Sequence, residues 1–102
     1  MLSIIFAGCV VPYFANSSHT ILMKSPTSTI AKVTCDTGHV LDLPDQIYAT
    51  ITLTCKWNVS ALNYTWHGTI GDWSVYIFST SILYEGHGGI YQWTPQCVRK
   101  YI

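Results

Sequence analysis

Charged side chains are scarce in this chain of 102 residues. They make up 10% of it, and five basic side chains balance five acidic ones, so the formal net charge is zero. Without an excess of lysine and arginine the chain lacks the positive field that holds a phosphate backbone, so we expect no nucleic-acid partner. The same balance argues against attachment to an anionic membrane by charge alone. Hydrophobic residues reach 49%, which at this length predicts a single folded domain.

Helical periodicity, long apolar runs and paired metal ligands are also missing. No segment repeats apolar residues at helical spacing between capping residues, and no run is long and apolar enough to span a bilayer. No two cysteines form a CxxC pair and the histidines are scattered, so we expect neither a metal nor another cofactor. The carboxylates stand at no spacing typical of acid–base catalysis, so no catalytic residue is predicted. These histidines and carboxylates are His19, His39, His67 and His87, and Asp36, Asp42, Asp45, Asp72 and Glu85.

Four cysteines and three N-x-Ser/Thr sequences are the positive features. The cysteines are even in number and widely spaced, which is typical of a disulfide framework formed in an oxidising compartment, but their spacing does not choose among the alternative pairings. The glycosylation sequences favour the same compartment. We therefore expect a secreted glycoprotein, or the extracellular part of a larger secreted or membrane protein, with Asn58 and Asn63 in an exposed loop. The cysteines are Cys9, Cys35, Cys55 and Cys97, and the asparagines are Asn16, Asn58 and Asn63.

The stretch between the second and third cysteines carries the clearest strand signal. Over residues 47–55 apolar and polar side chains alternate, and this two-residue period predicts a half-buried β-strand. We expect Leu53, together with Val33 on the preceding strand, to be buried beside disulfide bridges. Thr52 and Thr54 are expected to face solvent. The side predicted to point inward consists of Ile47, Ala49, Ile51, Leu53 and Cys55.

The rest of the chain is typical of an all-β protein. Short apolar segments rich in β-branched and aromatic residues alternate with turn residues, which predicts a small disulfide-rich domain of short antiparallel strands. The further predicted strands are residues 21–23, 31–35, 73–78, 81–84 and 90–93, with an irregular stretch at 57–71 and a glycine-rich turn at 85–89.

The order of these features resembles the complement control protein module, also called the sushi domain or short consensus repeat. Pro12 follows the first cysteine, GHVL occupies residues 38–41, GDWS occupies 71–74, and PQC closes the domain at 95–97. The resemblance covers residues 9–97 and implies a sushi-like fold. It also implies that the first cysteine pairs with the third and the second with the fourth. These bridges would be Cys9–Cys55 and Cys35–Cys97.

Two features depart from the family pattern. The interval between the third and fourth cysteines is longer than in the family, so part of residues 57–90 is interpreted as an insertion. The family has one packed tryptophan in this interval; four compete here, and we favour Trp93 over Trp73. Residues 98–102 are interpreted as a C-terminal tail. Residues 1–8 are apolar but short and lack a basic start, so they are either the remnant of a signal peptide or the beginning of a fragment. The four tryptophans are Trp57, Trp66, Trp73 and Trp93.

Two functions from different classes fit these observations. The leading hypothesis is a non-catalytic extracellular module for protein–protein recognition of the adhesion or complement type, with a protein or glycoprotein partner. The alternative is a small secreted enzyme, or a hydrolase fragment, whose site is assembled by the fold. Tyrosine and tryptophan are enriched at interaction hot spots, and the segment between Cys55 and Trp93 carries more large aromatics than a small core readily buries. The partner-binding residues are predicted to be Trp73, Tyr76, Phe78 and Tyr84.

Overall fold

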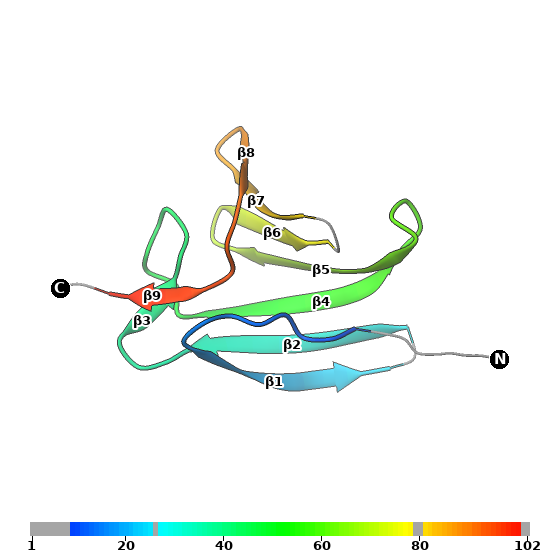
Figure 1. Cartoon of the computed structure of the whole chain (residues 1–102), viewed down its shortest axis with the longest axis horizontal. Coiled ribbons are helices and arrows are strands. Elements are labelled where there is room, and N and C mark those ends of the chain that lie inside the picture. Colours follow the sequence, from blue (N-terminus) through cyan, green and yellow to red (C-terminus); the bar gives the residue numbers. More distant parts are fainter. Residues whose placement is uncertain (1–8, 26, 79–80, 101–102) are drawn as a thin grey trace.

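The computed structural model describes residues 9–25, 27–78 and 81–100 of the chain. In this part it contains nine strands and no helix, and so no helix that could cross a membrane. The strands are β1 (Ser17–Lys24), β2 (Ser28–Cys35), β3 (His39–Leu41), β4 (Thr50–Asn58), β5 (Asn63–Ile70), β6 (Trp73–Ile77), β7 (Ile82–Gly86), β8 (Gly89–Gln92) and β9 (Cys97–Arg99). Seven form one antiparallel sheet in the order β1-β2-β4-β5-β6-β7-β8, and β3 pairs with β9 in a second sheet (Figure 1). The predicted all-β class is confirmed.

One face of the seven-stranded sheet, here called the inner face, holds the core. Along β4, Ile51, Leu53 and Cys55 are buried while Thr52 between them is exposed. Val33 on β2 is buried in the same way. The alternation follows from the pleat of a strand, which sends successive side chains to opposite faces. The prediction that Leu53 and Val33 lie inside and Thr52 outside is confirmed.

Three positions of that predicted strand differ from expectation. Thr54 is half-buried instead of exposed, because Ile30 and His67 flank it on the neighbouring strands. Ile47 and Ala49 are exposed, because β4 begins after them and both belong to the loop that follows β3. The strand expected over residues 47–55 therefore begins too early in the sequence, because β4 starts only at Thr50.

Residues 57–71, predicted to be irregular, are mostly strand. β4 continues to Asn58, and β5 begins at Asn63, which lies directly opposite it. Leu62 adopts a left-handed backbone conformation, with φ 52°, in the short turn between the two strands. β5 then pairs with β4 on one side and with β6 on the other. Pairing with both neighbours stabilises it as a strand, although its own polar sequence predicts a strand only weakly.

Both disulfides fasten covering segments to the inner face. Cys9 is bonded to Cys55, which holds the N-terminal segment on β4, with 6.2 Å between the two Cα atoms. Cys35 is bonded to Cys97, which holds β9 to the end of β2, with a Cα–Cα distance of 5.7 Å. This is the pairing that the sushi resemblance implies. All four cysteines are bonded, and none is a free thiol.

The segment interpreted as an insertion, residues 57–90, continues the large sheet. Its strands β5, β6 and β7 pair in sequence order with the rest of the sheet (Figure 1). On β6, Val75 is fully buried and Ile77 is 8% exposed. Removing residues from this segment would therefore open the core.

The segment interpreted as a C-terminal tail begins as a strand. Val98 and Arg99 belong to β9, which pairs with β3, so the tail prediction is wrong for these two residues. In this pair Cys97 lies opposite Leu41, and the second disulfide holds Cys97 to the end of β2. The interpretations of residues 1–8 and of 101–102 lie outside the described residues.

Three of the four tryptophans are packed in the interior. Trp66 and Trp73 are each 5% exposed and Trp93 is 7% exposed, whereas Trp57 is 51% exposed. Trp93 packs edge-on against Phe14, with 5.5 Å between ring centroids, and its Nε1 donates to the main-chain oxygen of Asp42 at 2.7 Å. Burial alone therefore does not single out one tryptophan as the packed one.

Candidate functional site

The four residues predicted to bind a partner lie on two opposite faces of the sheet. Trp73 and Tyr84 project to the inner face and Tyr76 to the outer face, because neighbouring positions in a strand alternate. Phe78 follows the end of β6, where its ring stacks with Tyr76 and it also lines the cleft beside the Cys9–Cys55 bridge. Trp73 is buried, and its Nε1 donates to Oδ2 of Asp45 at 3.1 Å. The prediction that Trp73 contacts a partner is therefore wrong.

Tyr84 also belongs largely to the interior. It is half-buried, and it packs edge-on against Trp73 and Trp93, with centroid distances of 5.4 and 6.5 Å. Tyr91 on the neighbouring strand stacks on it at 5.2 Å and is 47% exposed. These inner-face aromatics thus form a continuous wall that begins at Phe14 in the core and ends at the surface.

The outer face of the sheet carries a row of side chains that crosses every strand. The cross-strand register aligns one residue from each of the seven strands. Lys32, Thr52, Lys56 and Thr69 on this face are exposed, so along β2, β4 and β5 the described residues leave it open to solvent. The aligned residues are Met23, Ile30, Thr54, His67, Tyr76, Leu83 and Gln92.

Three rings stack on the outer face of β5 and β6. His67 and Tyr76 are cross-strand partners whose rings lie 4.7 Å apart and 14° from parallel. Phe78, two positions after Tyr76, also stacks with the Tyr76 ring, at 6.0 Å between centroids and 7° from parallel. We call His67, Tyr76 and Phe78 the outer stack. His67 is exposed, and the other two are half-buried.

The charges around the outer stack are mostly positive. Lys32 and Lys56 project from β2 and β4, and both are exposed. Glu85 on β7 is the one carboxylate carried by a strand of the large sheet, and its Oε1 accepts a hydrogen bond from the Tyr76 hydroxyl at 3.4 Å. The outer face thus combines a central aromatic surface with cationic side chains.

A polar cleft opens on the inner side of the molecule. It has a volume of about 410 Å³ and lies between the loop that follows β3 and the segment that joins β8 to β9. Asp42 and Gln46 line one wall, Gln96 lines the other, and the rings of Tyr84 and Trp93 complete it. No sequence pattern predicts this cleft, because its two walls are far apart along the chain.

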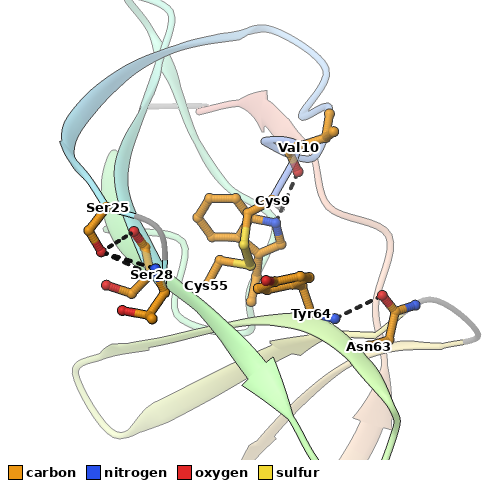
Figure 2. The surroundings of a disulfide bond; sticks show 9 residues. Cys9, Val10, Ser25, Ser28, Cys55, Asn63 and Tyr64 are labelled. Carbon is orange, nitrogen blue, oxygen red and sulfur yellow. Dashed lines mark hydrogen bonds between the residues drawn. A yellow bond between two sulfur atoms is a disulfide. The ribbon is translucent and has the colours of Figure 1, made fainter. Parts of the chain in front are cut away.

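A smaller apolar cleft lies at the other end, beside the Cys9–Cys55 bridge. It has a volume of about 230 Å³, and Figure 2 shows Tyr64 next to the bridge. Trp66 lines this cleft as well, and its Nε1 donates to the main-chain oxygen of Val10 at 2.9 Å. The residues that line this cleft are mostly apolar, and Tyr64 is the only titratable side chain among them. The cleft is therefore interpreted as a gap between packed segments.

The predicted glycosylation residues occupy strand ends. Asn58 is half-buried and Asn63 exposed, and they face each other across the β4–β5 hairpin. In each, the side-chain oxygen accepts hydrogen bonds from nearby main-chain N–H groups. Asn16 is exposed, but its Nδ2, the atom that would carry a glycan, donates to the main-chain oxygen of Cys97 at 3.1 Å.

The histidines lie on different elements of the fold. His19 lies on β1, His39 on β3 and His87 in the β7–β8 turn against Trp73. In the part of the chain that the structure describes, no three His, Cys, Asp or Glu side chains come close enough to hold a metal ion.

His67 is the member of the outer stack that the sequence does not predict, because it lies in the stretch expected to be irregular, residues 57–71. Its neighbours nevertheless alternate: Tyr64 and Trp66 point inward and Thr65 points outward, all three with high strand propensity.

No protein-family model, curated protein or solved structure matches this chain, so its function has to be inferred from its own residues.

Proposed function

We propose that the chain is a non-catalytic extracellular binding module that recognises a protein or glycoprotein partner through its outer face. The observation that carries this proposal is the outer stack of His67, Tyr76 and Phe78 on an uncovered sheet face. Aromatic side chains give a large contact area at a small cost in conformational entropy, which is why they dominate interaction hot spots.

The outer stack is well suited to this role because it is ordered before a partner arrives. The Tyr76 ring stacks with His67 and with Phe78, and its hydroxyl donates a hydrogen bond to Oε1 of Glu85. Side chains that are already fixed lose little further entropy on binding. Lys56 is exposed two positions along β4 from Thr54, the cross-strand neighbour of His67, and Lys32 is exposed farther away on β2, so the complementary partner surface is apolar at its centre and acidic at its rim.

The polar cleft supports recognition over acid–base catalysis. Asp42 is the one carboxylate in its lining, and its Oδ2 accepts a hydrogen bond from Nε2 of Gln96 at 2.8 Å. General acid–base catalysis of the glycosidase kind uses two carboxyl groups in different environments. A small secreted enzyme is therefore the weaker of the two candidates.

The extracellular location and the sushi-like character belong to the same proposal. Two disulfides are consistent with an oxidising compartment, and three N-x-Ser/Thr sequences agree with secretion. The first-to-third and second-to-fourth bridge pairing supports the resemblance to the complement control protein module.

A binding screen with matched variants tests the proposed function. The secreted chain is applied to an array of purified receptor ectodomains, and each hit is repeated with Y76A and with Y13A. Tyr13 is 81% exposed on the N-terminal segment, so Y13A removes a tyrosine outside the outer stack. We expect Y76A to weaken binding by about 2 kcal/mol or more, roughly thirtyfold, and Y13A to bind like the parent chain.

The screen needs a folding control, and two of its possible results would contradict the proposed function. Both variants must first show the unfolding midpoint of the parent chain, so that lost binding is not lost structure. An array without any hit, or hits that Y76A and F78A bind as tightly as the parent, would contradict the proposal.

A further inference from the structure

The polar cleft has walls that are already joined by hydrogen bonds. The main-chain N–H of Asp42 donates to the oxygen of Gln96 at 3.0 Å, and Nε2 of Gln96 donates back to Oδ2 of Asp42 at 2.8 Å. Nε1 of Trp93 donates to the oxygen of Asp42 at 2.7 Å. These three bonds fix the two walls relative to each other, so a ligand would enter a preformed site.

The loop that forms one wall is held at both ends. Leu41, at its start, donates from its main-chain N–H to the oxygen of Tyr48 at 2.7 Å. Asp45, near its middle, accepts the indole hydrogen bond from Trp73. The Cys35–Cys97 bridge anchors the opposite wall. The cleft is therefore a built feature of the fold rather than a gap under a loose loop.

The lining combines aromatic rings with groups that both donate and accept hydrogen bonds. Tyr84 and Trp93 supply the rings, and the exposed Tyr91 extends this wall outward. Gln46 is exposed at the mouth, and Gln96 and Asp42 stand opposite each other inside. The Gln amides both donate and accept hydrogen bonds and the Asp42 carboxylate accepts them, which suits hydroxyl groups, since a hydroxyl can donate and accept.

Charged ligands fit this lining poorly. It contains no lysine or arginine, so nothing in it neutralises a phosphate or sulfate. Asp42 is its single carboxylate, which is too few for a divalent cation. The volume of about 410 Å³ lies within the roughly 300–1,000 Å³ typical of small-molecule sites.

We propose that the polar cleft binds a neutral hexose unit, either a free sugar or the terminal unit of a glycan. The hydroxyl groups of the sugar would meet Asp42, Gln46 and Gln96, and the apolar face of its ring would lie against the aromatic wall. This site is on the opposite side of the sheet from the outer stack. The sugar-binding proposal and the proposed function can therefore be tested independently.

Titration of the full chain, with both bridges formed and its own glycans removed, tests the proposal. Methyl α-mannoside, N-acetylglucosamine and lactose are added separately while amide and indole NMR signals are followed. We expect at least one sugar to shift the signals of Asp42, Gln46 and Trp93, with a dissociation constant in the millimolar range. A glycopeptide ending in the same sugar then distinguishes the sources: tighter binding points to a glycan, and equal binding to the free sugar.

Variants make the test specific. Q46A removes an exposed hydrogen-bonding group without touching the wall-to-wall bonds, and we expect it to weaken sugar binding about fivefold to tenfold. T69A, an exposed change on the outer face, should leave sugar binding unchanged. The proposal is overturned if none of the three sugars shifts the cleft signals, if Q46A binds like the parent, or if inorganic phosphate shifts the same signals and the sugars do not.

Discussion

At the scale of single residues, Gly68 shows how closely two central strands approach each other. A Cβ atom on Gly68 would lie 2.7 Å from the main-chain oxygen of Thr52 and 2.8 Å from Cδ2 of Leu53. The main-chain atom cannot give way without moving β4. We therefore expect G68A to lower the free energy of unfolding by about 1–3 kcal/mol, measured by urea denaturation.

The adjacent threonine provides the control for this substitution. Thr69 is exposed on the outer face, so T69A should change stability by no more than about 0.5 kcal/mol. If G68A were as stable as T69A, β4 and β5 would not be packed as closely as described.

Leu53 tests which face of the sheet is inside. It is fully buried in the core between Ile51 and Cys55. Truncation leaves a cavity that packed neighbours fill only in part, so we expect L53A to cost about 2–4 kcal/mol in urea unfolding. T52A, one position earlier and exposed, should be nearly neutral; equal costs for the two variants would mean that the register is misread.

At the scale of elements, the two bridges hold different parts of the fold. The bonded cysteines are 46 and 62 positions apart, and each bridge removes chain entropy from the unfolded state. We expect C9A/C55A and C35A/C97A each to lower stability by up to about 4 kcal/mol. The second pair should also raise hydrogen exchange in β3 and β9, because it frees β9 from β2.

A peptide map without reduction checks the pairing directly. It should yield one peptide pair linking Cys9 to Cys55 and another linking Cys35 to Cys97. A link between Cys9 and Cys35 would contradict both the fold and the sushi resemblance.

Local sequence predicted the elements whose pattern is local. Alternation predicted the core of β4, and a short apolar segment rich in aromatic residues predicted β6, where Trp73, Val75 and Ile77 point inward. Local sequence did not predict the β3–β9 pair, because each strand has only three residues and the two lie far apart along the chain.

The candidate sites were predictable only in part, for the same reason. The aromatic segment that carries Tyr76 and Phe78 was identified from composition, but the face on which each ring lies depends on strand register. The polar cleft depends on the contact between Trp93 and Asp42, which are 51 positions apart in the sequence. No local sequence pattern predicts a contact between residues so far apart in the chain.

At the scale of the whole molecule, one sheet determines the shape. The molecule measures 54 × 30 × 18 Å, a flat body in which one layer of loops and short strands covers the inner face (Figure 1). The core and both bridges use the inner face, which leaves the outer face free for contacts. The inner face thus holds the fold together, and we propose that the outer face contacts the protein partner.

A glycan placed on the outer face tests that claim most directly. T52N creates an N-x-Thr sequence with Leu53 and Thr54, and places the glycan two positions along β4 from the cross-strand neighbour of His67. T27N creates one with Ser28 and Thr29 at the exposed β1–β2 connection, and serves as the control. Both are expressed in a secreting eukaryotic host, and occupancy is confirmed by mass.

The measurement is the affinity of each glycosylated variant for an ectodomain that the parent chain binds, before and after enzymatic removal of the glycan. We expect glycosylated T52N to lose binding, because its glycan covers the outer face, and to regain binding once the glycan is removed. T27N should bind like the parent chain throughout. Undiminished binding by fully glycosylated T52N would contradict the claim that the outer face is the binding surface.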